Sequence, residues 1–141
     1  MTATITTSAF DCGRARIRSH FRHLATVVTI DGEIDAVNVE RVIERARRFV
    51  LAKDPLVLDT SNVNSCAAEG ISLLNVIAED CGAAGVEWVL VPGAAIADVL
   101  RDTGYDAMIP VARSVHEALH DFADVIDRRR QLLLPLVRTT A

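Results

Sequence analysis

The spacing of apolar residues changes several times along the chain, and each change predicts a change of secondary structure. Residues 14–18 alternate charged with apolar side chains, and residues 24–30 are rich in β-branched residues, so both segments are predicted to be strands. A short polar link between them predicts a β-hairpin, whose second strand ends at the turn signal Asp31-Gly32. Residues 39–50 then place apolar side chains at helical spacing, and Asp35 is available as a cap before them.

Beyond Pro55, short apolar strands alternate with amphipathic helices. Strands are predicted at residues 56–58, 87–91 and 109–111, and a helix follows each of them. The last helix begins at Ser114-Val115-His116-Glu117, which has the spacing of a capping box. The predicted element order is therefore ββαβαβαβα. Such alternation implies an α/β fold whose five-stranded sheet is mostly parallel and opens with the hairpin.

The same pattern divides the chain into three parts. Residues 1–13 are rich in threonine and serine and are expected to form a flexible N-terminal tail. Residues 14–130 contain all of the predicted strands and the four α-helices, and they are expected to form a single domain. Residues 131–141 are left as a C-terminal tail that contains Pro135.

Composition narrows the class of protein. Half of the 141 residues are hydrophobic and 24% are charged, which is typical of a globular protein with a core. The net charge of −4 argues against a general nucleic-acid binder. Three cysteines without metal-type spacing indicate reduced thiols inside the cell. The N-terminus lacks a signal-peptide pattern, and the apolar run 132–137 is too short to cross a bilayer. We therefore expect a cytoplasmic protein that binds no membrane.

The sequence holds no complete catalytic or metal-binding pattern. Its glycines match neither a dinucleotide site nor a phosphate-binding loop. His20 with His23, and His116 with His120, are interpreted as surface residues, because no further ligand completes a metal site. Cys66 precedes a helix, where the dipole lowers a thiol pKa, but a small side chain in a tight corner is the preferred interpretation. We expect a protein that is not an enzyme and that binds neither a cofactor nor a metal ion.

Three segments carry motifs that occur together, in this order, in a known family. TVVTIDGEIDAVNVERVIERA matches an opening strand, turn and helix at Val28, Ile30, Gly32, Glu33, Ile34 and Asp35. LVLDTSNVNSCAAEGISLL matches a central strand and loop at Leu58, Asp59, Ser61, Val63 and Gly70. GVEWVLVPGAAIADVLRDTGYDAMIPVARSVHEAL is similar to the family's last third. From about residue 26 to residue 122, the chain thus resembles the STAS domain of sulphate transporters and anti-sigma factor antagonists.

The resemblance implies a non-enzymatic module for protein interaction. In bacterial partner switching, an antagonist of this family binds an anti-sigma factor that is itself a serine kinase, and this frees the sigma factor for transcription. Phosphorylation of a serine in the family's Asp-Ser-Ser-Gly loop ends the binding. A phosphate adds about −1.5 to −2 charges at the N-terminus of a helix on the docking surface.

This sequence departs from the family at that loop. Asp-Ser-Ser-Gly falls on Ala67, Ala68, Glu69 and Gly70, so Glu69 stands where the phosphoacceptor serine would be. Two interpretations remain open. Either Glu69 is a fixed, weaker copy of the phosphorylated state, or the loop has lost that role and Glu69 only stabilises the first turn of a helix, by about 0.3–1 kcal/mol. Phosphorylation at a neighbouring serine, Ser61 or Ser65, is a third option.

The resemblance also implies a site and a partner. The expected partner-binding loop comprises Asp35, Ser61, Asn64, Ser65, Cys66, Ala67, Ala68, Glu69 and Gly70. Glu69 is predicted to lie exposed at the start of a helix, and residues 64–68 are predicted to form a surface loop. The expected partner is an anti-sigma factor or a related kinase-fold protein. The alternatives are a STAS-fold scaffold that assembles with itself or other subunits, and a small-molecule sensor.

Overall fold

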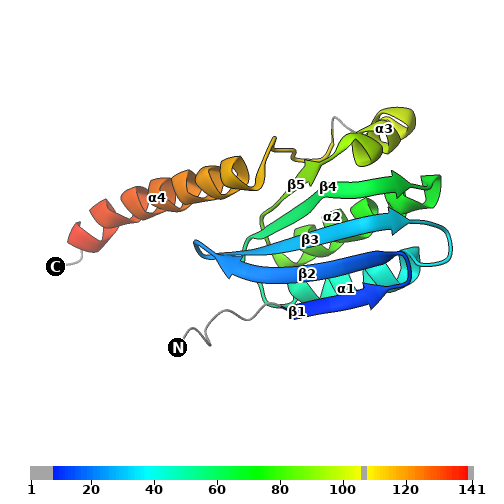
Figure 1. Cartoon of the computed structure of the whole chain (residues 1–141). Coiled ribbons are helices and arrows are strands. Elements are labelled where there is room, and N and C mark those ends of the chain that lie inside the picture. The colour runs from blue at the N-terminus through cyan, green and yellow to red at the C-terminus, as the bar shows by residue number, and fades with distance from the viewer. Residues whose placement is uncertain (1–7, 106–107, 140–141) are drawn as a thin grey trace.

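The computed structural model describes residues 8–105 and 108–139, which form one sheet with helices packed on it (Figure 1). The sheet has five strands in the order β1-β2-β3-β4-β5. The strands are β1 (Ser8–Cys12), β2 (Ala15–Arg22), β3 (Ala25–Ile34), β4 (Leu56–Cys66) and β5 (Trp88–Pro92). The helices are α1 (Val39–Val50), the 3-10 turn η1 (Ala68–Gly70), α2 (Ile71–Ala84), α3 (Ala94–Thr103) and α4 (Val115–Thr139).

The strand directions confirm the predicted fold class with one correction. The opening hairpin, the single α/β domain and the four α-helices are present. Strands β3, β4 and β5 are parallel, whereas β1 with β2 and β2 with β3 are antiparallel. The sheet is therefore mixed and not mostly parallel, because the hairpin is extended by a third antiparallel strand.

That additional strand corrects the expected N-terminal tail, since β1 occupies residues 8–12 of it. The predicted edge strand at residues 109–111 makes only one bridge, between Val111 and Leu90. The Pro110 carbonyl accepts the N–H of Leu90 at 2.8 Å, but Pro110 has no N–H group to donate in return, which limits a regular ladder. The strand that completes the five is therefore β1, which lies at the edge opposite to β5. At the other end of the chain, α4 continues to Thr139, into the expected C-terminal tail.

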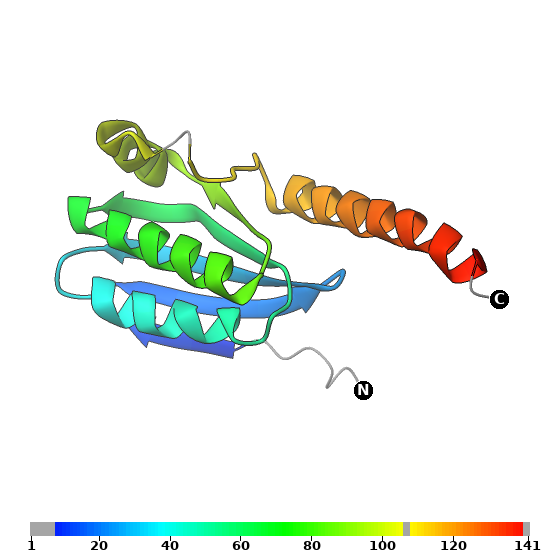
Figure 2. The ribbon, with the colours of Figure 1, turned by 180° about the vertical axis from the view of Figure 1, so that it is seen from behind.

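Two apolar clusters hold the layers together. Helices α1 and α2 lie side by side on one face of the sheet, over buried residues such as Ile17, Ile30 and Leu58 (Figure 2). The first turns of α4 pack against the other face, where Leu119 and Phe122 join a second buried cluster. The rest of α4 projects away from the sheet (Figure 1). None of the helices in the described ranges is both long and apolar enough to cross a membrane.

Strand β3 passes through Asp31-Gly32, which was expected to end it. Gly32 has a φ of +101°, and β3 shifts register against β4 on both sides of this region. A Cβ atom at Gly32 would overlap the carbonyl oxygen of Arg14, which accepts a hydrogen bond from the N–H of Glu33 at 3.1 Å. The pair therefore forms a glycine bulge within the strand, where the β1–β2 turn crosses it closely.

Two glycine substitutions should change stability in opposite directions. Gly32→Ala should lower the free energy of unfolding by at least about 2 kcal/mol, because it combines a positive φ with an overlap against backbone. Gly82→Ala is the control, since Gly82 is an exposed helical position with open space around its Cβ direction. It should raise stability by up to about 0.5–1 kcal/mol. Urea unfolding of both variants checks this, and a neutral Gly32→Ala would contradict the assigned crossing.

Candidate functional site

The candidate site lies at the edge of the sheet where the three parallel strands end. The β3–α1 loop, the β4–α2 corner and the β1–β2 turn meet at this edge. The residue pair Ile34–Cys66 joins the last positions of β3 and β4, and the N–H of Ala67 donates to the carbonyl of Ile34 at 2.9 Å. Open α/β sheets usually place their binding residues at this end of the strands.

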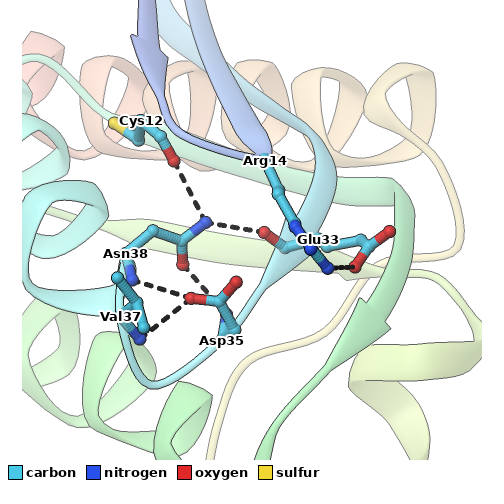
Figure 3. A network of polar contacts seen from close by, with 6 residues as sticks. All are labelled: Cys12, Arg14, Glu33, Asp35, Val37 and Asn38. Atoms are coloured by element: carbon cyan, nitrogen blue, oxygen red, sulfur yellow. Dashed lines mark hydrogen bonds and ion pairs between the residues drawn. The ribbon is translucent and has the colours of Figure 1, made fainter.

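The β3–α1 loop is fixed by a reciprocal pair of side chains, Asp35 and Asn38 (Figure 3). Asp35 Oδ1 accepts the N–H groups of Val37 at 2.9 Å and Asn38 at 2.8 Å. The N–H of Asp35 in turn donates to Asn38 Oδ1 at 2.9 Å. Asp35 was predicted to cap the helix, but its carboxylate bonds within the turn that precedes α1. The loop is consequently rigid, although Val37 at its tip is 82% exposed.

Asn38 also connects this loop to two other segments. Its side chain is buried, and its Nδ2 group donates to the carbonyl of Cys12 at 3.0 Å and to that of Glu33 at 2.8 Å (Figure 3). The amide therefore satisfies the β1–β2 turn and the end of β3 at once. Sequence analysis missed Asn38, and the only signal was an asparagine directly before the apolar helical pattern.

The β4–α2 corner differs in part from its prediction. Asn64, Ser65 and Cys66 were expected in a loop, but they belong to β4 because they continue the parallel pairing with β3. Ala67 alone links β4 to η1, which begins at Ala68. Glu69 is exposed and lies in η1, which runs directly into α2, so its predicted placement at the start of a helix is confirmed.

Cys66 fills the interior of this corner. Its Sγ donates to the carbonyl of Ala67 at 3.3 Å, and a Cβ atom at Gly70 would overlap the sulfur. Burial raises the pKa of the Cys66 thiol, so it carries less thiolate than an ordinary cysteine at neutral pH. The geometry gives the thiol a packing role, and a larger residue at position 70 would have to displace the Cys66 side chain.

The other predicted residues lie further back along β4. Asp59 is buried, and its Oδ1 accepts hydrogen bonds from the N–H of Ser61 at 3.0 Å and from the Ser61 hydroxyl at 2.6 Å. Asn64 and Ser65 are exposed. The structure thus brings Asp35 and residues 64–70 together at one edge, and Ser61 faces a buried carboxylate behind it. The exposed part of this edge combines Val37, Ala68 and Glu69 with the ion pair between Arg14 and the half-exposed Glu33, which suits contact with a protein surface.

Comparisons with known proteins show the family of the chain. Residues 16–118 match the family model described as the STAS domain. Osmosensory protein A of Mycobacterium tuberculosis is 54% identical over 138 residues, covering 95% of this chain and 87% of the relative. The anti-sigma-F factor antagonist RsfA of the same species is 28% identical over 120 residues, covering 82% of this chain and 92% of that protein.

The fold is also found among solved structures. An anti-sigma factor antagonist from Mycobacterium paratuberculosis superposes with a TM-score of 0.65 at 26% sequence identity, over 83% of this chain and 92% of that one. The family model covers well over half of this chain, and the relative with 54% identity covers almost all of it. The chain therefore belongs to the STAS domain family.

Proposed function

We propose that this chain is a non-enzymatic interaction module of the anti-sigma factor antagonist type, which docks a partner at the edge that carries Glu69. The observation that carries the proposal is the exposed edge formed by Val37, Ala68 and Glu69 on a rigid frame of loops. The expected partner is an anti-sigma factor or a related kinase-fold protein, as the likeness to RsfA and to the paratuberculosis antagonist supports.

Glu69 gives this module a fixed charge in place of a switchable serine. Residues 67–70 carry no hydroxyl group, so a kinase has no acceptor there. The exposed carboxylate of Glu69 supplies one negative charge, whereas a phosphoserine supplies about −1.5 to −2. The chain is then held in a weaker copy of the phosphorylated state. The similarity to Osmosensory protein A supports an osmotic stimulus as the input of the pathway.

Removing this charge should tighten partner binding. Glu69→Ser should lower the dissociation constant for a purified anti-sigma factor by about tenfold or more, equivalent to about 1.4 kcal/mol, because the carboxylate no longer has to be desolvated. Glu69→Gln should act similarly, since it also removes the charge. Glu79→Gln is the matched control, because Glu79 is another exposed acid and lies farther along α2. Titration calorimetry provides the constants.

The same variants separate the two interpretations of Glu69. Equal dissociation constants for the wild type and Glu69→Ser would rule out the mimic and leave a residue that only stabilises the first helical turn. In addition, Glu69→Ser should gain one phosphate from the kinase partner and ATP, whereas the wild type should keep its mass. A phosphate on the wild type, mapped to exposed Ser61 or Ser65, would show that the switch has moved along β4.

Thiol reactivity tests the non-enzymatic part of the proposal. Burial raises the pKa of Cys12 and Cys66, and burial together with Asp80 raises the pKa of Cys81 to about 11. A higher pKa leaves less thiolate at pH 8, so iodoacetamide should alkylate all three more slowly than free cysteine, and Cys81 about a hundredfold more slowly. Urea should abolish the protection. Rapid alkylation of Cys66 in the folded protein would instead indicate an activated nucleophile.

A further inference from the structure

A cavity of about 220 Å³ lies between the β2–β3 turn and the first turns of α4. It is lined by Arg22, His23, His116, Leu119, His120 and Ala123. The β2–β3 turn lies at the start of β3, whereas Glu69 lies near the end of β3. The cavity is therefore remote from the edge proposed for partner docking. The chain has four histidines, and three of them line this one cavity.

The first turns of α4 place two of these histidines, His116 and His120, on one side of the helix. One half of the predicted capping box is present, because Ser114 Oγ accepts the N–H of Glu117 at 3.0 Å. Glu117 Oε1 accepts the N–H of Arg113 at 3.1 Å, one residue before the expected donor Ser114. His116 and His120 are four residues apart and therefore neighbours on the helix surface. Leu119, between them, is buried against the sheet and fixes the rotation of α4.

The third histidine comes from a strained turn. His23 and Leu24 connect β2 to β3 and have φ values of 49° and 68°, the combination required by a type I′ turn. Such turns favour Asn-Gly, because this conformation is unfavourable by about 1–2 kcal/mol for a residue with a large side chain. Strain of this kind is concentrated at functional sites. Here the strained turn brings the imidazole of His23 to the cavity.

The lining has the chemistry of an anion site. Arg22 carries a permanent positive charge, the three imidazoles supply N–H donors, and none of the six lining residues is acidic. Burial, followed by the charges of Arg22 and Arg18, lowers the pKa of neighbouring His20, as expected where the local field is positive; Asp59 opposes this shift. Among the residues that the structure describes, no three potential ligands are grouped to hold a metal ion.

We propose that this cavity binds a small organic anion. Its carboxylate or phosphate group is held by Arg22 and the imidazoles of His23, His116 and His120, and a short apolar portion packs against Leu119 and Ala123. The volume lies below the roughly 300–1,000 Å³ of pockets for drug-sized ligands, so the ligand is small. Because its contacts come from the β2–β3 turn and from α4, a bound anion ties the helix to the sheet. Asp124 Oδ2 lies 3.7 Å from His120 Nε2 and competes with the anion for that imidazole.

Three probes test the site on the full chain: phenyl phosphate, benzoate and inorganic phosphate. Phenyl phosphate and benzoate should raise the melting temperature and shift the NMR signals of His23, His116 and His120, and the former should bind more tightly than inorganic phosphate. The comparison of phenyl phosphate with benzoate decides between phosphate and carboxylate. The double variant His116→Gln/His120→Gln should bind at least tenfold more weakly. His20→Gln is the control, because His20 does not line the cavity.

A second variant uses the strain of the turn. His23→Asn/Leu24→Gly introduces the preferred type I′ sequence, so it should melt at a higher temperature than the wild type and yet lose most of the rise caused by phenyl phosphate. A purely structural turn would gain stability and keep that rise. The proposal is overturned if the histidine variants bind the anions as the wild type does, or if none of the three probes shifts the histidine signals.

Discussion

The side-chain amide of Asn38 is the interaction on which the arrangement of the Glu69 edge depends. It donates to the carbonyls of Cys12 and Glu33 and accepts the N–H of Asp35, so one buried side chain joins the β1–β2 turn, the end of β3 and the start of α1. The contact with Cys12 is buried and the other two are part-buried, so each group that lost its partner would destabilise the fold by up to about 1–3 kcal/mol. The exposed tip of the loop, Val37, can therefore present an apolar side chain to a partner without collapsing onto the domain.

The position of α4 follows from the distribution of polar residues on the face that α1 and α2 leave uncovered. Near the start of the parallel strands, this face presents an apolar row in which Val27 pairs with Val57, and α4 packs there. Further along, the row becomes polar, with Arg18 opposite Thr29 and Thr29 beside Asp59. A helix over the second row would have to desolvate the ion pair between Arg18 and Asp31, which is still partly exposed, so α4 covers only the first. This restriction brings its histidines to the β2–β3 turn and leaves the other end of the sheet free.

Local patterns predicted most of the fold, and long-range contacts account for what they missed. The helical spacing of residues 39–50, the Ser114 cap of α4 and the exposed position of Glu69 all depend on neighbours within a few residues, and all were found. The strand β1, the bulge at Gly32 and the role of Asn38 depend on the β1–β2 turn crossing β3, which no periodicity encodes. Likewise, β4 runs on to Cys66 only because β3 offers it a partner that far. The sequence analysis missed the histidine cavity for the same reason, because it considered the pair His20 and His23 separately from the pair His116 and His120.

A fixed charge at the docking edge has a consequence for regulation. A serine lets a kinase turn binding off and a phosphatase restore it. The carboxylate of Glu69 instead contributes the same repulsion at all times, whether that repulsion is large or small. Under the proposed function, control must then act through another part of the chain or through the abundance of the protein. The cavity at the far end of β3 has the chemistry for such an input, since an anion held there gains its affinity only when α4 and the strained turn are in place. Reciprocity then requires that the factor by which a bound anion favours the docked position of α4 equals the factor by which docking of α4 raises the affinity for the anion.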